Sequence, residues 1–369
     1  MWNETEAARL LRVTYPIVQG PFGGGLSSVE LTAAVSNLGG LGSFGAHIFS
    51  PAHIRDIVVR IGERTASPFA INLWVDNEDP AMARFDRASF ERHVGRLHAH
   101  YAALELDTPT FPDRFGQNFD EQIEALIEAA PPVISFVFGV PSPRIVEACR
   151  SRGIRTIGNA TTVEEAHAIE AAGIDLVLAS GAEAGGHRVS FLEPPERSLV
   201  GTFALIPQVR DAVRIPVIAA GGIADGRGVA AAMALGADGV QVGTAFLACA
   251  ESGASPLYRA ALLSDRARHT TLTRVFSGRL ARAICNGYSE EMAAYGDDLA
   301  PYPAQNWLTN SLRGAAIERG RDDLLSIYAG QSAALLCHRT AGELFDALVR
   351  ETRQVFQARA GGHFKFLGA

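Results

Sequence analysis

Short apolar runs alternate along the chain with longer stretches whose apolar positions recur at helical spacing. Runs of this kind are typical of strands buried on both faces of a parallel sheet. They predict strands at Ile17–Gln19, Gly42–Phe44, Phe69–Leu73, Val133–Phe136, Arg155–Gly158, Leu176–Ala179, Val217–Ala220 and Val240–Val242. The stretches between them predict helices at Val29–Asn37, Pro51–Ile61, Phe119–Ala129, Pro143–Arg150, Val163–Ala172, Leu205–Ala212 and Gly228–Leu235. This order is the βαβα pattern of an α/β protein.

The number of strands favours a closed barrel, because eight strand–helix units are what a parallel barrel contains. An internal repeat supports this fold. Ile154–Gly181 and Ile215–Thr244 both run through a strand, a polar turn, an alanine-rich helix, a Gly-x-Asp turn and a second strand. An open, doubly wound sheet would accommodate the same repeat, so the strand count decides. We expect a TIM-type (β/α)8 barrel with an inserted, mostly helical cap or second small domain.

Two segments interrupt the alternation. Residues 75–117 hold a charged helix near Arg92–Leu104, and residues 264–331 are polar and helical. Loops this long are usually lids or insertions. We expect a ligand-binding barrel over 1–263 with an insertion at about 75–117, a helical cap or substrate subdomain over 264–331, and a C-terminal segment over 332–369. The helix of the last segment carries an apolar stripe that would return it to the barrel, at Leu344, Leu348, Val349 and Phe356.

The composition is that of a globular protein, since 47% of the 369 residues are apolar and 20% are charged. A net charge of −7 argues against binding to nucleic acids or anionic membranes, which requires a basic surface. The four cysteines form no CxxC pair, which fits neither a disulfide framework nor a zinc site and favours a reducing cytoplasm. The chain shows no signal core and no run of about 18 apolar residues. We expect a cytoplasmic protein, and its oligomeric state stays open.

The segment Pro216–Thr244 holds the clearest candidate for a binding site. It predicts a strand, a Gly221-Gly222 turn, a helix, a second strand and a Gly243-Thr244 turn. The carboxyl ends of neighbouring parallel strands open on the same side, and glycine lets main-chain N–H groups approach a ligand closely. A helix that starts behind the first turn adds partial positive charge. The segment therefore predicts an anion site, and a phosphate suits it best.

Glycine-rich turns also follow other predicted strands, at Gly20–Gly25 and Ser180–Gly186. One such turn is explained equally well as a simple tight turn, but four on one face of a barrel favour a ligand site. The first strand–helix turn lacks the spacing of a Rossmann fingerprint. A metal-ligand cluster, a GxSxG segment and a Walker A loop are also missing from the sequence, which argues against metallohydrolases, serine hydrolases and P-loop NTPases.

His187 is the strongest catalytic candidate. It follows Gly185-Gly186 at a predicted strand end, where backbone freedom can direct an imidazole into a pocket. An unperturbed histidine exchanges a proton near neutral pH, so His187 suits a general base or a hydrogen-bond donor. A solvated loop histidine explains the position equally well. The flanking Glu183 and Arg188 either pair with each other or face solvent.

The third predicted strand also ends in candidate ligand contacts. Asn72 closes the run PFAIN, where its amide either hydrogen-bonds a planar heterocycle or caps a turn. Trp74, Phe111 and Phe115 are candidates for lining a substrate pocket, and packing in the core or a lid explains them equally well.

In order along the chain, these segments resemble the nitronate monooxygenase family, once called 2-nitropropane dioxygenases. The family consists of FMN-dependent barrel enzymes related to the FMN-containing enoyl-acyl-carrier-protein reductases. The resemblance covers most of residues 16–331. It rests on PIVQGPFGGG, LTAAVSNLGGLGSFGA, PFAINLWV, VISFVFGVP, NATTVEEA, GAEAGGHR, LIPQV, AAGGIADGRGVAAAMALGADGVQVGTAFL, TRVFSGRLAR, PYPAQNWLTNSLR and YAGQ.

The resemblance implies that the phosphate belongs to FMN, bound by the barrel, and it implies no metal. It places the cofactor-binding residues at Gly20, Pro21, Phe22, Asn72, Ser180, Gly185, Gly221, Gly222, Gln241, Val242, Gly243 and Thr244. His187 falls on the active-site histidine of the family, near the substrate nitro group. The implied reaction oxidises an alkyl nitronate, or a nitroalkane, with O₂ to a carbonyl compound and nitrite through a transiently reduced flavin. A protonated His187 would hold an anionic nitronate, whereas a neutral His187 would remove the α-proton of a nitroalkane.

Three positions depart from the family pattern. Ser180 stands where relatives often have Gln, Val189 where they have Gly, and Phe22 where they often have Met. These differences leave the substrate less constrained than the fold or the flavin. An NAD(P)H-dependent FMN reductase that acts on quinones or enoyl thioesters therefore stays open as an alternative. A flavin-binding protein without activity is a third interpretation, which the intact GGHR segment argues against.

Overall fold

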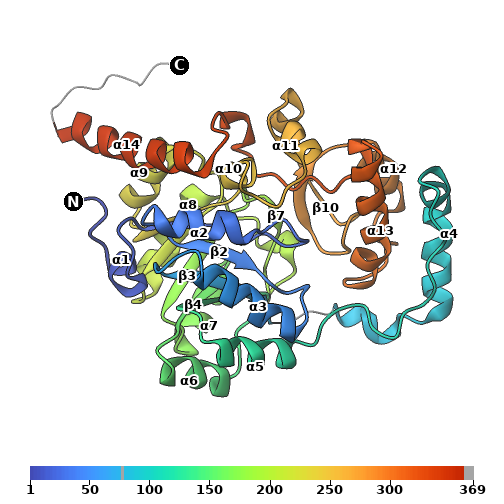
Figure 1. Ribbon diagram of the computed structural model, residues 1–369, viewed down its shortest axis with the longest axis horizontal. Coiled ribbons are helices and arrows are strands. Elements are labelled where there is room, and N and C mark those ends of the chain that lie inside the picture. Colours follow the sequence, from blue (N-terminus) through green and yellow to red (C-terminus); the bar gives the residue numbers. More distant parts are fainter. Residues whose placement is uncertain (76–78, 361–369) are drawn as a thin grey trace.

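Eight parallel strands form the centre of the protein in a computed structural model that describes residues 1–75 and 79–360 (Figure 1). They run in the order β1-β9-β8-β6-β5-β4-β3-β2, and a bridge between Val18 and Leu41 brings the two edges together. Their bounds are β1 Ile17–Gln19, β2 Gly42–Gly45, β3 Phe69–Trp74, β4 Val133–Val137, β5 Arg155–Ala160, β6 Leu176–Ser180, β8 Val217–Ala220 and β9 Gly239–Val242. The predicted TIM-type barrel is confirmed, and each of its eight predicted strands is present.

The strands are apolar on both faces because each face packs against other residues. Alternate positions on six strands form one cluster inside the barrel, made up of Val18, Ala70, Val133, Ile157, Leu176, Leu178, Ile218 and Ala220. Helix α1 (Glu6–Leu11) closes one end of this interior, since Ala7 and Leu11 belong to the same cluster. The intervening positions, such as Ile71 and Ile134, point outward and pack with residues of the surrounding helices.

The predicted helices are present around the barrel, as α2 Val29–Asn37, α3 Pro51–Gly62, α5 Phe119–Ala129, α6 Pro143–Ser151, α7 Val163–Ala171, α8 Thr202–Ala212 and α9 Gly226–Ala234. Capping side chains set several of their starts, because Ser28, Asn118 and Thr162 each accept a hydrogen bond from a first-turn N–H. Helix α8 begins at Thr202 rather than at the predicted Leu205. The carboxylate of Glu183, far away in sequence, accepts the Thr202 N–H at 2.9 and 2.8 Å and caps this start.

Helix α4 (Arg87–Ala103) lies away from the barrel at the far right of Figure 1, where it covers α13 (Ala304–Glu318). The Tyr101 hydroxyl donates to the Leu308 carbonyl at 2.6 Å, and the Phe90 ring lies 5.7 Å from that of Trp307. The Asp86 side chain caps α4, which therefore starts before the predicted Arg92. Part of the predicted insertion, residues 76–78, lies outside the described residues.

The segment after residue 263 contains a small sheet that was not predicted from the sequence. Strands β10 (Thr270–Thr273) and β11 (Ala281–Ile284) are antiparallel, and β11 also pairs with β7 (Gly186–His187). Helices α12 (Gly287–Met292) and α13 follow. This sheet ties residues of the segment 264–331 to the loop that leaves β6.

The remaining elements complete the chain. Helix α14 (Ala341–Ala360) packs on α9 and α2 through Leu344, Phe345 and Leu348, and its Glu351 accepts the Gly226 N–H at 3.1 Å. Two further helices are α10 Thr244–Leu247 and α11 Pro256–Leu262. Short 3-10 helices lie at Pro80–Arg84, Pro195–Arg197, Asp265–Arg268, Ala293–Tyr295, Asp322–Leu324 and Ala333–Leu335.

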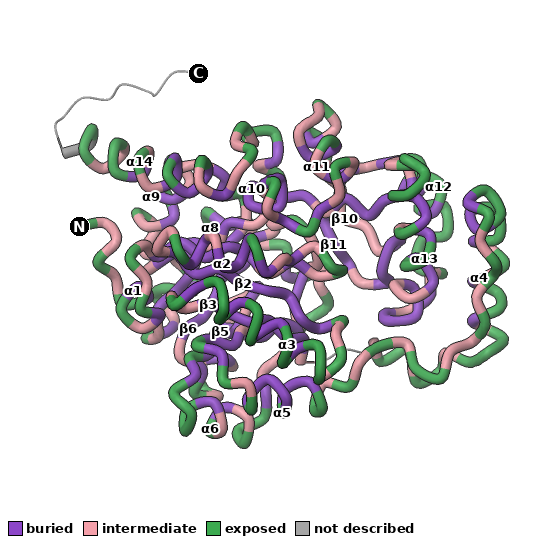
Figure 2. The backbone as a smooth tube through the Cα atoms, viewed as in Figure 1, coloured by how far each residue is buried: buried purple, intermediate pink, exposed green. Residues whose placement is uncertain are grey.

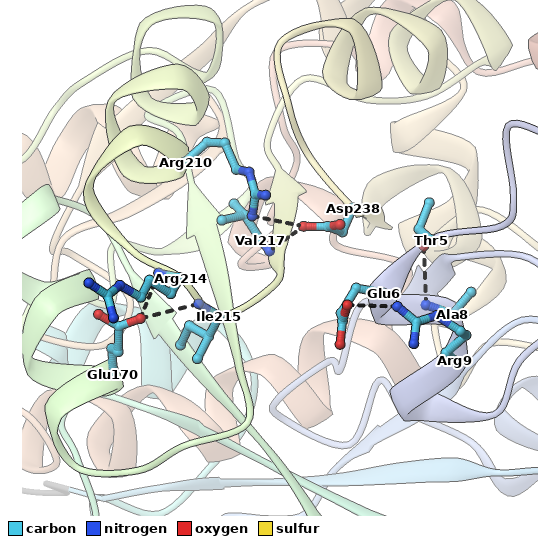
Figure 3. Close-up of polar contacts among 10 residues, drawn as sticks. All are labelled: Thr5, Glu6, Ala8, Arg9, Glu170, Arg210, Arg214, Ile215, Val217 and Asp238. Carbon is cyan, nitrogen blue, oxygen red and sulfur yellow. Dashed lines mark hydrogen bonds and ion pairs between the residues drawn. The ribbon is translucent and has the colours of Figure 1, made fainter.

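Carboxylate contacts fix where β8 begins (Figure 3). Glu170 accepts the N–H groups of Arg214 and Ile215 at 2.6 and 3.2 Å, and Asp238 accepts that of Val217 at 3.1 Å. These contacts lie where the chain enters the strand, so they also set where its other end, the Gly221 turn, emerges.

Buried positions concentrate on the strands and the inward sides of the helices, whereas α4 exposes its outer side (Figure 2). Among the described helices, none combines the length and apolarity needed to cross a membrane.

Candidate active site

A cavity of about 450 Å³ opens at the carboxyl ends of the barrel strands, and α13 together with the loops before and after it covers it. Twelve of the predicted site residues line it, namely Gly20, Pro21, Phe22, Asn72, Ser180, Gly185, His187, Gly221, Gly222, Gln241, Gly243 and Thr244. Val242 does not line it, because its side chain is buried in the core. Its carbonyl instead accepts the Gly20 N–H at 2.9 Å and so ties the first glycine turn to β9.

The glycine turns after β8 and β9 present unused main-chain donors. Gly221 and Gly222 have φ values of 104° and 70°, which only glycine adopts without strain, and a Cβ on Gly221 would lie 2.7 Å from Thr202 Oγ1. Within the described residues, the N–H groups of Gly222, Gly243 and Thr244 donate to no protein acceptor. The first N–H groups of α9 are not available in this way, because Asp225 already accepts those of Arg227 and Gly228. Among the described residues, the N–H donors without an acceptor at this edge thus belong to the two turns rather than to the start of α9.

A serine holds the turn after β1 in place. Ser27 Oγ accepts the N–H groups of Phe22 and Gly45 and donates to the Phe22 carbonyl, at 2.9 to 3.0 Å. Phe22 is buried and lines the cavity. The adjacent Gly23 leaves room for His47, since a Cβ there would lie 2.8 Å from the imidazole.

His187 lies in the cavity wall and not in open solvent. Its backbone pairs with Ala281 of β11, its Nε2 lies 2.8 Å from Ser277 Oγ, and its ring meets the Trp74 ring edge-on at 5.2 Å. Burial, together with Arg279, His47 and Arg313, lowers the pKa of His187 from 6.5 to about 3. The imidazole is therefore neutral at physiological pH.

A second histidine, His47, was not among the sequence candidates. It lies two residues after the end of β2, and its ring stacks on that of Trp74 at 3.9 Å. Burial and Arg279 lower its pKa from 6.5 to about 3, and its Nδ1 has no hydrogen-bond partner within the described part of the chain. The same signal that singled out His187, a histidine just after a predicted strand, was available for this residue.

Helix α13 contributes a polar face to the cavity through Asn306, Asn310 and Arg313. The Arg313 guanidinium donates to Asn306 Oδ1 at 3.0 Å and to Asn310 Oδ1 at 3.2 Å, and it forms no ion pair with any described carboxylate. Burial lowers the pKa of Arg313. Nearby tyrosines partly offset this shift, and Tyr328 has the largest effect among them. The spacing of three and four residues places these side chains on one side of the helix, and this pattern was readable in PYPAQNWLTNSLR.

The apolar wall of the cavity consists of rings and branched side chains, namely Trp74, Val137, Val189 and Tyr302, packed together with Phe138. The Arg279 guanidinium lies over the rings of Phe138 and Tyr302, with its Cζ 4.2 and 4.4 Å from their centroids. Trp74 therefore lines the cavity. Phe111 and Phe115, suggested for the same role, instead pack around Phe90 between α4 and α13.

The residues that flank His187 support the loop and do not pair with each other. Arg188 is 2% exposed and donates to the carbonyls of Ser180, Gly181 and Ser198 at 2.7 to 3.2 Å. Its burial lowers its pKa to about 10. Glu183 caps α8 as described above. The buried arginine thus holds the strand end that leads into the glycines before His187.

Asn72 has fewer free atoms than its position suggested. Its Nδ2 donates to the carbonyl and to the hydroxyl of Ser135, at 3.1 and 3.0 Å. Asn159, on β5, also lines the cavity, although its motif was noted only as part of a longer segment. Over residues 1–75 and 79–360, no group of three His, Cys, Asp or Glu side chains is placed to hold a metal ion.

Comparison with known proteins gives consistent similarities over nearly the whole chain. The model of the family described as Nitronate monooxygenase matches residues 4–351. A protein described as "Probable nitronate monooxygenase" from Staphylococcus aureus is 40% identical over 358 residues, which are 97% of this chain and 99% of that protein. Among solved structures, nitroalkane oxidase from Streptomyces ansochromogenes has a TM-score of 0.87 at 36% identity and covers 95% of this chain and 99% of its own. FabK from Thermotoga maritima has a TM-score of 0.76 at 29% identity, with 97% and 99% covered.

Proposed function

This chain belongs to the nitronate monooxygenase family and is an oxidoreductase, and on this premise we propose that it oxidises alkyl nitronates, or the parent nitroalkanes, with O₂ on a bound FMN. The products would be a carbonyl compound and nitrite. The observation that carries the proposal is one cavity in which a neutral histidine, an arginine that pairs with no described carboxylate and two glycine turns face the same space. The similarity to a nitroalkane oxidase from Streptomyces supports this substrate class.

The residues present fit a flavin mononucleotide. The N–H groups of Gly222, Gly243 and Thr244 have no acceptor among residues 1–75 and 79–360, and they suit a phosphate. A Cβ on Gly185 would lie 2.5 Å from the Gly330 N atom. At this wall of the cavity, the backbone segments at Gly185 and Gly330 therefore pass too close together for any residue other than glycine at position 185. Bound FMN would accept electrons from the substrate and pass them to O₂. The chain itself binds, orients and exchanges protons.

Arg313 supplies the charge that an anionic substrate needs. A nitronate carries a negative charge delocalised over its nitro group, and a guanidinium donates well to such a planar anion. The partners of Arg313 in the protein are neutral amides, a hydroxyl and carbonyls, so its charge is available for a ligand. Placing an anion beside it would offset the cost of burying this cation.

His187 acts in its neutral form, because its pKa is lowered to about 3. With a nitroalkane, the neutral imidazole accepts the α-proton, and Ser277 orients the ring. With a nitronate, no proton has to be removed, and a ring N–H would donate a hydrogen bond to the nitro oxygen. Of the two roles that the sequence left open, the low pKa argues against the protonated one.

Anaerobic mixing of the purified protein with a nitronate tests the proposal. We expect the flavin absorbance to bleach, and nitrite to appear once O₂ is admitted. Since His187 is neutral, kcat/KM with a nitroalkane should show no transition near pH 6.5, and His187→Asn should lower it by about 100-fold or more.

The same experiment with NADPH separates the alternative. If NADPH bleaches the flavin rapidly and nitronates yield no nitrite, the protein is an NAD(P)H-dependent flavin reductase and the proposed reaction is wrong. Unchanged turnover in His187→Asn would remove the role given to this histidine but leave the reaction standing.

A further inference from the structure

The inward positions of the barrel strands form two layers. The lower layer is the apolar cluster that includes Ala70, Val133 and Ile157. Two residues further along the same strands the inward positions are Asn72, Ser135 and Asn159, because side chains of a strand alternate between its faces. Asn72 and Asn159 both line the cavity. The floor of the cavity is therefore polar, although the barrel beneath it is not.

The two amides in this floor differ in their partners. Both N–H bonds of Asn72 are used by Ser135, which leaves only its oxygen for a ligand. The side chain of Asn159 makes no hydrogen bond to the described residues, and its Oδ1 is shielded from water. A shielded amide oxygen that accepts no hydrogen bond destabilises a folded protein unless a ligand supplies a donor. Ser43 Oγ is also buried without a partner among the described residues, but it does not line the cavity.

We infer that Asn159 is a cofactor-contacting residue that hydrogen-bonds the polar edge of the flavin ring, an inference that rests on the proposed function. A primary amide carries an acceptor beside a donor, which is complementary to an N–H beside a carbonyl. The pyrimidine side of the flavin ring has such an edge. On the neighbouring strand β6, the side chain of Ser180 is short and its carbonyl is occupied by Arg188, so Ser180 is less suited to this role.

The test compares Asn159→Leu and Asn159→Ala with the wild-type chain, each freed of flavin and then titrated with FMN. Leucine is close to asparagine in size and needs no hydrogen bonds. We expect both variants to bind FMN about 10-fold to 100-fold more weakly. Without FMN, we expect Asn159→Leu to melt at the same temperature as the wild type or higher, because an unpartnered amide has been removed.

A matched control is Asn37→Ala. The Asn37 amide lies outside the cavity and has partners in Arg64 and Thr65. Its loss should lower the melting temperature of the flavin-free protein and leave FMN affinity unchanged. A purely structural Asn159 would behave like this control.

The possible results distinguish a failure of the inference about Asn159 from a failure of the proposed function. If the wild type binds FMN and Asn159→Leu and Asn159→Ala bind it equally well, the inference is wrong and the proposed function stands. If flavin-free Asn159→Leu melts at a lower temperature than the wild type, Asn159 stabilises the fold and the inference is again wrong, whether or not FMN affinity also falls. If the wild type binds no FMN, the proposed function itself fails.

Discussion

Two neutral histidines, His47 and His187, line one cavity, and both rings contact that of Trp74. Burial lowers the pKa of each from 6.5 to about 3, with Arg279 as the next cause. Unfolding returns each to its ordinary value, so between pH 6.5 and 3 the unfolded chain binds protons that the folded chain does not. Both residues therefore leave stability intact above pH 6.5 and reduce it as the pH falls below that value.

We predict that His47→Asn makes the protein less sensitive to acid. One such histidine contributes a slope of up to about 1.4 kcal/mol per pH unit to the free energy of unfolding. Urea unfolding at several pH values between about 7.5 and 4.5 measures this slope, with the exposed His98→Asn as control. A slope in His47→Asn as steep as that of the wild type would show that His47 is protonated in the folded state.

Arg313 gives a second prediction at this scale. Replacing it by Met keeps the length of the side chain but removes the charge, and a charge-assisted hydrogen bond is worth roughly a 10-fold to 100-fold change in binding. We expect Arg313→Met to raise KM for a nitronate by this factor, with FMN content unchanged. Arg319→Met is the control, because Arg319 ends the same helix and pairs with Glu105 on the surface. Equal KM values in the two variants would remove Arg313 from substrate binding.

Individual site residues were predictable from the sequence where they lie at or just after the end of a predicted strand. His187, Asn72 and the glycine turns follow predicted strands, and the barrel brings those ends together. Arg313 was not predictable in this way, because it enters the cavity from a helix more than 100 residues after His187. The spacing of apolar and polar residues along the chain does not indicate which helix covers the open end of the barrel. His47 was predictable in principle and was overlooked.

Among the elements, the turns after β8 and β9 impose the strictest demands on the backbone. Gly221 combines a φ of 104° with close neighbours, whereas Gly153 has a φ of 71° and open space around its Cα. Alanine at either position strains the backbone by about 1 kcal/mol. At Gly221 the added methyl group also meets Thr202 Oγ1 at 2.7 Å and must displace it or the turn.

We therefore predict that Gly221→Ala lowers FMN affinity by about tenfold or more, while Gly153→Ala only reduces stability. Fluorescence titration with FMN and thermal melting of both variants measure the two effects. Equal FMN affinity in both variants would show that the turn after β8 does not position the cofactor.

The strands and helices of the barrel were predictable because most strands are short apolar runs and each helix is long enough to show apolar residues at helical spacing. Strands β10 and β11 were not, since TTLT and ARAI contain no continuous apolar run. Their stability comes from pairing with each other and with β7. The early start of α8 was hidden for a related reason, because its cap is Glu183, which is remote in sequence.

Over the whole molecule, the barrel and the segment that covers it are joined at the catalytic candidate itself. His187 belongs to the loop after β6, yet its backbone pairs with β11 and its imidazole contacts Ser277. Arg188 then donates its N–H to the Leu280 carbonyl at 2.8 Å. The position of His187 therefore depends on both parts of the fold.

This arrangement has a consequence for how the protein can diversify. The turns that suit a cofactor lie on the barrel, whereas Ser277, Arg279 and Arg313 all come from one contiguous stretch, residues 264–331. Exchange of that stretch between relatives would alter these side chains and keep the sequence of the glycine turns, although Gly330 in it donates to Thr244 Oγ1. New specificities can thus arise by recombination at two crossover points, without rebuilding the barrel.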